Sequence, residues 1–186
     1  MNVMEAIYSR RAVREYSDQA IDRSTVAKLI QAAVQAPSAI NMQPWAFAVI
    51  HDKAILKRYS DRAKRSFTKS AEFASLPGEL QQMLSDPNFN IFYNAGTLIA
   101  IYAKPIGEHP DWDCCLAGQN LMLAACDMGL GTCPIGFAWD LLGEPDIRRE
   151  LSIPEGYKPV LPIIVGNPKH STAAVSRHEP EIACWL

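Results

Sequence analysis

The sequence predicts a single domain of the α/β or α+β class, in which helices outnumber strands. Its 186 residues fit one domain, because domains typically hold about 100–200 residues. Apolar residues at helical spacing alternate with short apolar runs that are typical of buried strands. The three runs are 46–50 (AFAVI), 97–103 (TLIAIYA) and 160–165 (VLPIIV).

The first part of the chain predicts three helices around the first of these strands. Residues 3–9 form a short helical stretch that two arginines follow. Asp22 is a suitable N-cap for a second helix, which runs to about residue 36 and which Pro37 stops, because the residue before a proline avoids the helical region. Asp52 is expected to cap a third helix directly after strand 46–50.

The segment 65–94 carries two turn signals, at 77–78 and 86–88, so we predict an excursion with one short helix that serves as a lid. Residues 111–128 predict the longest helix. It is apolar on every side, which is typical of a central helix or one at a subunit interface. Gly129 is expected to end it, and a short helix is expected near 145–151.

The charge balance and the cysteines exclude several classes of protein. Eighteen basic and twenty acidic residues give a net charge of −2, so we expect neither a nucleic-acid nor a membrane partner. The cysteines are five in number and two of them are adjacent, which fits free thiols in a reducing compartment. The N-terminal residues lack the apolar run of a signal peptide. We therefore expect a cytoplasmic protein.

Familiar nucleotide, hydrolase and metal motifs are missing. GLGTCP places Pro134 where a dinucleotide-binding loop needs its third glycine. The sequence contains neither the G-x-x-x-x-G-K-[ST] phosphate-binding loop of nucleoside triphosphatases nor the G-x-S-x-G nucleophile elbow of hydrolases. The four histidines have no ligand spacing, so no metal site is expected.

Three segments carry residues suited to binding. Arg10, Arg11 and Arg14 could together hold a phosphate, since guanidinium groups form paired charge-assisted bonds with it. Taken alone, the segment favours a solvated patch that complements a helix C-terminus. Residues 37–45 (PSAINMQPW) offer amides for a flat heterocycle, or form a surface loop with its own turns. Residues 129–137 (GLGTCPIGF) would let bare backbone approach a ligand, or simply end a helix and turn.

In this order, and with RRAVREY, APSAINMQPWAF and GLGTCPIGF at these separations, the segments resemble the nitroreductase family of flavoproteins. The similarity covers nearly the whole chain, 1–186, as one domain. It implies an α+β fold with a central, mostly antiparallel sheet flanked by helices, and an intertwined homodimer. It also implies FMN bound at the dimer interface and reduced by NADH or NADPH.

The resemblance implies a role for each matched residue. Arg10, Arg11 and Arg14 match the N-terminal FMN motif, with Arg10 on the phosphate and Arg14 near the N1/O2 edge of the flavin. Arg177 matches a late phosphate-binding arginine. Pro37 and Ser38 are expected to reach the FMN of the other subunit. Ser38 also borders the ring, together with Asn41 and Gln43. Ile135 and Gly136 match the segment whose backbone faces the flavin N5 atom.

No side chain is expected to act as a nucleophile or metal ligand, because the flavin carries the chemistry. The implied activity is hydride transfer from NAD(P)H to FMN and then to a nitroaromatic, quinone or related acceptor in a ping-pong cycle. Within the fold, a reductive dehalogenase, an enone reductase or a flavin-consuming enzyme is the alternative. Outside it stands a flavin-storing or redox-sensing protein with Cys114 and Cys115 as sensor.

Overall fold

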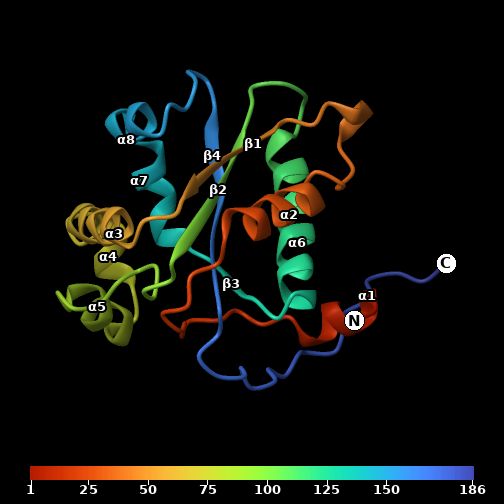
Figure 1. Cartoon of the computed structure of the whole chain (residues 1–186), viewed down its shortest axis with the longest axis horizontal. Coiled ribbons are helices and arrows are strands. Elements are labelled where there is room, and N and C mark those ends of the chain that lie inside the picture. Colours follow the sequence, from red (N-terminus) through yellow and green to blue (C-terminus); the bar gives the residue numbers. More distant parts are fainter.

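A four-stranded antiparallel sheet runs through the middle of the protein in the order β1-β2-β4-β3 (Figure 1). The computed structural model describes residues 1–186. The strands are β1 (Trp45–Ile50), β2 (Thr97–Ala103), β3 (Gly131–Pro134) and β4 (Lys158–Gly166). β2 is buried along its whole length, as expected for a strand whose sheet is covered on both faces.

Helices cover the two faces, and β2 contributes alternate side chains to each core. Leu98 and Tyr102 point into one core, whereas Ile99 and Ile101 point into the other, because successive strand residues face opposite sides. Figure 1 shows α2 and α6 on one face, and α3, α7 and α8 on the other. Their bounds are α2 (Arg23–Ala33), α3 (Lys53–Phe67), α6 (Pro110–Asp127), α7 (Trp139–Gly143) and α8 (Pro145–Glu150). The α+β class with an antiparallel sheet is therefore confirmed.

The helix ends follow the local sequence. Asp22 and Asp52 accept hydrogen bonds from the first turns of α2 and α3, which satisfies N–H groups that have no partner within a helix. Gly129, at φ +72°, follows the end of α6. α1 (Val3–Ser9) begins with a reciprocal capping pair between Asn2 and Glu5.

Two predictions of secondary structure need correction. The excursion 65–94 contains two short helices, α4 (Ala71–Ser75) and α5 (Gly78–Ser85), where one was expected. The segment 131–134 is a strand, β3, and not only a turn after the long helix. Glycine and proline bound this edge strand, and they hide its strand character because neither favours a regular ladder. A short turn, η2 (Gly136–Ala138), then leads into α7.

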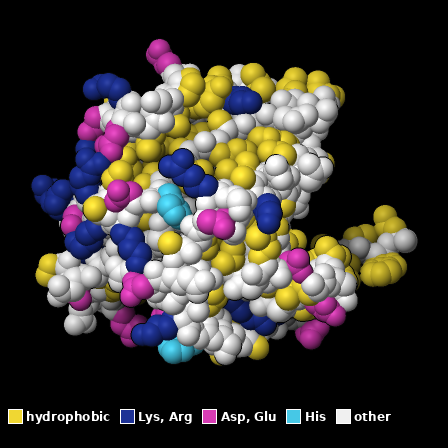
Figure 2. Space-filling view, in the orientation of Figure 1, with side chains coloured by type: hydrophobic (Ala, Val, Ile, Leu, Met, Phe, Trp, Pro, Cys, Tyr) yellow, Lys and Arg dark blue, Asp and Glu magenta, His cyan; other side chains and the backbone are white.

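The end of the chain leaves the sheet. Residues 169–186 are all exposed, and the hydrophobic side chains at the tip of this tail project away from the rest of the surface in Figure 2. No helix has both the length and the apolar character that crossing a membrane requires.

Candidate functional site

The arginine segment lies against the start of β3. The Val13 N–H donates to the Thr132 carbonyl at 2.9 Å, and on the other side the Lys169 N–H donates to the Glu15 carbonyl at 3.0 Å. A Cβ on Gly131 would lie 2.7 Å from the Cβ of Val13. Only glycine permits so close an approach. Two of the three predicted segments are therefore held together by backbone contacts.

A hollow of about 550 Å³ opens where this segment leaves α1. Arg10, Arg11 and Lys169 line it together with the hydroxyl side chains of Ser171 and Thr172, and no carboxylate does. Cations and hydroxyl donors without an acidic neighbour suit an anion such as a phosphate.

The two neighbouring arginines differ in what they do. The Arg11 guanidinium donates to the carbonyls of Tyr8 at 2.6 Å and of Arg10 at 2.9 Å, at the end of α1. This is the helix-complementing role that the sequence left open, although its Nε is buried without a partner. No such bond occupies the half-buried Arg10 side chain, so its donors are available to a ligand.

Arg14 and Gly136 lie beyond the hollow, just after its lining residues Val13 and Thr132 in the two paired segments. The residues 12 and 132 pair in parallel, so Arg14 follows the direction in which β3 leads to Gly136. Arg14 follows Arg10 by four positions, which in extended chain is a reach of roughly 13 Å. Gly136 is exposed, and a Cβ built on it would meet nothing within 4 Å. Ile135 just before it is buried, with its N–H bound to the Pro162 carbonyl at 2.9 Å.

The loop 37–44 is strained and closed on itself. Ile40, Asn41 and Gln43 have φ of 43°, 59° and 50°, a left-handed conformation that is uncommon for residues other than glycine. The Gln43 N–H donates to the Ser38 hydroxyl at 2.9 Å, and the Gln43 amide donates to Asn41 Oδ1 at 3.0 Å. Such strain is stored at binding sites more often than elsewhere.

This loop lies at the opposite end of α6 from Arg10. The Ala39 N–H donates to Asp113 in the first turn of α6. Cys126, in the last turn of α6, lines the hollow with Arg10, and the N-terminal amino group of Met1, just before α1, pairs with Asp127 there. Fourteen residues of helix span roughly 21 Å. One chain therefore does not bring the loop and the arginine segment to the same small ligand.

The predicted site residues thus fall into two groups and one outlier. One chain brings together Arg10, Arg11, Arg14, Ile135 and Gly136. The loop residues Pro37, Ser38, Asn41 and Gln43 lie apart from them. Arg177 stands in the exposed tail without a hydrogen bond or ion pair. Sequence reasoning did not single out Lys169, whose signal is only a cation that follows the last strand, or Tyr93, which packs on Arg14.

The adjacent cysteines do not form an accessible pair. Cys114 is fully buried, and burial raises the pKa of its thiol to about 12. Cys115 points outward, and partial burial also raises the pKa of that thiol. Reactive sensor cysteines need a lowered pKa, so these thiols do not support the redox-sensor alternative.

Comparison with known proteins gives consistent matches over this fold. The model of the nitroreductase family matches residues 7–167. A putative NADH dehydrogenase/NAD(P)H nitroreductase of Archaeoglobus fulgidus is 33% identical over 171 residues, which cover 89% of this chain and 85% of that one.

Two further relatives bear on the ligand and on the substrate. The solved structure of an FMN-dependent nitroreductase from Clostridium difficile is 25% identical, with a TM-score of 0.83, and the match covers 99% of each chain. The iodotyrosine deiodinase of Thermotoga neapolitana is 24% identical over 161 residues, which cover 80% of this chain and 84% of that one.

Proposed function

This chain belongs to the nitroreductase family, and we propose that it is an enzyme that binds FMN and uses NADH or NADPH to reduce a nitroaromatic, quinone or related acceptor. The observation that carries the proposal is the cationic hollow at Arg10 and Lys169, from which the arginine segment and β3 run in parallel towards Arg14 and the open backbone of Gly136. The FMN-dependent relative from Clostridium difficile supports the cofactor, and the Archaeoglobus fulgidus relative supports NAD(P)H as the donor.

The groups at Arg10 and at Gly136 fit the two ends of FMN. The hollow at Arg10 and Lys169 offers cations and hydroxyls without a carboxylate, which suits the phosphate. The exposed backbone of Gly136 offers open space for a flat ring. The reach of roughly 13 Å between Arg10 and Arg14 suits a phosphate joined to its ring through a ribityl chain.

Each residue then has a physical task. Arg10 binds the phosphate, and Arg11 holds the end of α1 in place beside it. Arg14 lies at the N1/O2 edge, where a cation stabilises negative charge. Gly136, with Ile135 buried beneath it, presents an N–H at the start of η2, where such groups lack an intrahelical acceptor. When bound, FMN supplies hydride acceptance and donation, which no side chain here needs to provide.

We propose further that the complete site needs two chains. Antiparallel packing of α6 against α6 of a second copy would set the loop 37–44 of one chain beside the partner's arginine segment. The exposed face of α6 carries Trp112 (62% exposed) and Leu116 (47% exposed). Beside the C-terminal end of α6, α1 exposes Val3 and Met4. Apolar surface gathered in this way marks an interaction face. Met122, on the same helix, is buried in the core of the single chain.

The tail supports the same arrangement. Its exposed apolar end, with Trp185 at 86% exposure, has no cover within the chain and would find it on a second copy. If the tail docks on a second copy, Arg177 would also come close to a bound phosphate, which it does not approach within its own chain. The excursion 65–94 would then border the acceptor space as a lid.

A reductive dehalogenase is the second candidate, because the chain is similar to an iodotyrosine deiodinase. Release of iodide from an iodinated phenol, compared with reduction of a nitroaromatic and a quinone under the same conditions, separates the two activities.

The proposed function is tested by the visible spectrum of the purified protein. We expect flavin bands that bleach on anaerobic addition of NADH or NADPH and return when a quinone is added. A colourless protein that gains no flavin bands on incubation with FMN would overturn the proposal. Light scattering on the same sample, with a dimer expected, tests the two-chain site.

A further inference from the structure

The end of the excursion touches the arginine segment through a single aromatic ring. The guanidinium carbon of Arg14 lies 5.8 Å from the ring centroid of Tyr93, within the range of a cation–π contact. No hydrogen bond or ion pair within the chain holds this guanidinium, and Arg14 is exposed. The Tyr93 ring is therefore what restrains its position.

The backbone that carries this ring is strained and tightly held. Tyr93 and Asn94 have φ of 51° and 57°, and such conformations persist where the surroundings impose them. The buried Asn90 does so, since its side chain accepts from the Phe92 N–H at 2.9 Å and donates to Asn94 Oδ1 at 3.1 Å. The Phe89 ring packs edge-on against Tyr93, with centroids 5.5 Å apart.

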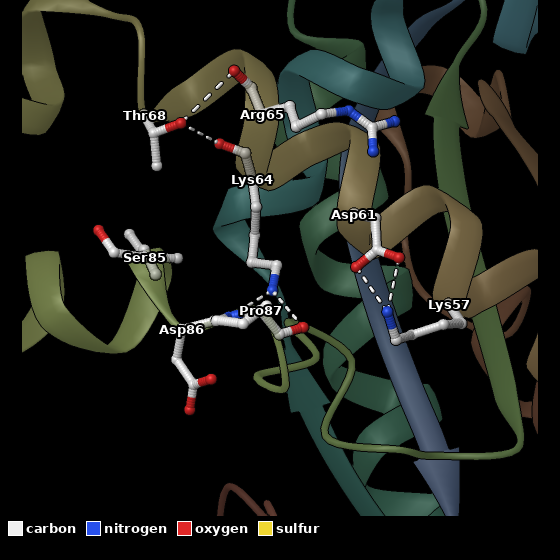
Figure 3. A pocket seen from close by; sticks show the side chains of 9 residues that line it. Lys57, Asp61, Lys64, Arg65, Thr68, Ser85, Asp86 and Pro87 are labelled. Carbon is white, nitrogen blue, oxygen red and sulfur yellow. Dashed lines mark hydrogen bonds and ion pairs between the residues drawn. The ribbon is translucent and has the colours of Figure 1, made fainter.

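A buried cation anchors the turn before it. The Lys64 ammonium, on α3, donates to the carbonyls of Asp86 at 2.7 Å and of Phe89 at 2.5 Å, and its residue is 7% exposed. Figure 3 shows a second hollow, between α3 and the turn at 85–87, with the Lys64 side chain reaching across it to the turn and Lys57 paired with Asp61. Both lysines of this second hollow are thus held within the chain. Lys64 fixes the excursion to α3.

We propose that Tyr93 is a positioning residue for Arg14, through which the excursion sets the reduction potential of the bound flavin. The inference rests on the proposed function, in which Arg14 lies at the N1/O2 edge. A cation held there favours the flavin form that carries negative charge at that edge, because an opposite charge at short range stabilises it. A guanidinium released from the ring samples other positions and stabilises that form less.

The test compares midpoint potentials of the FMN-loaded protein, measured spectroscopically against a reference dye. Tyr93→Phe keeps the ring, and we expect the wild-type potential. Tyr93→Leu removes the ring, and we expect the ratio of reduced to oxidised flavin to fall about three- to tenfold, equivalent to about 15–30 mV for a two-electron couple. Tyr157→Leu is the matched control. This half-buried tyrosine directly precedes the first residue of β4, whereas β3 pairs with the other end of that strand.

A double-mutant cycle assigns the effect to Arg14. Arg14→Gln removes the charge and lowers the potential, and adding Tyr93→Leu to it should then change nothing further. An unchanged potential in Tyr93→Leu, or an equal shift with and without Arg14, overturns the inference. Should Tyr93→Leu fail to fold, Tyr93→Asn replaces it, since asparagine tolerates the left-handed backbone.

The outcomes separate this inference from the proposed function. A wild-type protein that takes up no FMN overturns both. A wild-type protein that is yellow and reducible, with a Tyr93→Leu variant of the same potential, overturns only the role of Tyr93. The dissociation constant of FMN, titrated into the apoprotein by fluorescence, gives a second readout. We expect this dissociation constant to rise less than threefold in Tyr93→Phe.

Discussion

The contact between Gly131 and Val13 gives the sharpest prediction about how the site is built. In Gly131→Ala, the new methyl would lie 2.7 Å from the Val13 Cβ and 2.8 Å from both of its methyl groups, whereas ordinary contacts begin at 3.4 Å. The Val13 Cβ is bonded directly to the backbone, so a change of side-chain rotamer cannot relieve this contact. The arginine segment must therefore move away from β3. Overpacking of this kind costs about 1–3 kcal/mol.

The stability of the apoprotein in urea or on heating measures this effect. For a chain of this size, about 1–3 kcal/mol corresponds to a fall in Tm of roughly 2–12 °C. FMN affinity should fall as well, because the arginines move with the segment. An apoprotein of Gly131→Ala with wild-type stability would show that residues 10–17 do not pack on β3 as described.

Gly136→Ala is the matched control for this prediction. A methyl on Gly136 meets nothing within 4 Å, so the stability of the apoprotein should stay within about 0.5 kcal/mol of wild type. FMN affinity should nevertheless fall, because the methyl would occupy the space proposed for the ring. Equal destabilisation by the two substitutions would contradict the assignment of tight and open positions.

Three further predictions address the phosphate, the dimer and the buried thiol. Arg10→Ala should weaken FMN binding about 10- to 150-fold, from the loss of about 1.5–3 kcal/mol in bonds to a charged group, whereas Arg11→Ala should mainly lower stability. Fluorescence titration measures the first effect and urea unfolding the second, and an unchanged FMN affinity in Arg10→Ala counts against the phosphate site. Leu116→Glu should convert a dimer into a monomer by light scattering, and a variant that remains dimeric would exclude this face of α6. Burial raises the pKa of the Cys114 thiol to about 12, so this thiol stays protonated in the folded protein while the unfolded thiol ionises above about pH 9. The free energy of unfolding should therefore fall as pH rises from about 9 towards 12, by up to about 1.4 kcal/mol per pH unit. Urea unfolding of Cys114→Ala should show a weaker dependence on pH.

Local chemistry made much of the fold predictable. Asp22, Asp52 and Gly129 mark helix ends through a short-range cause, a side-chain cap or a left-handed residue, and the sequence reveals such causes directly. β3 escaped prediction because its strand character comes from pairing with β4, and not from Gly131 or Pro134 themselves. Long-range pairing overrides weak local preference.

The site was predictable in composition but not in arrangement. The arginines, the amide loop and the glycines each have side chains or backbone suited to binding, and the resemblance to the nitroreductase family joined them. What the sequence does not reveal is that the length of α6 separates the loop from Arg10. The contact of Tyr93 with Arg14 was also invisible, because it depends on how the excursion folds back on the sheet.

Backbone strain gives an independent indication of where this protein is specialised. Six residues other than glycine have positive φ, and five of them lie in the loop 37–44 or at 93–94. Each such residue costs of order 1–3 kcal/mol and persists only where its surroundings fix it. The two segments are far apart in the sequence and share no structural task within one chain. In the proposed two-chain site, the loop 37–44 of one chain and Tyr93 of the other would both border the ligand, and this would account for strain at both places.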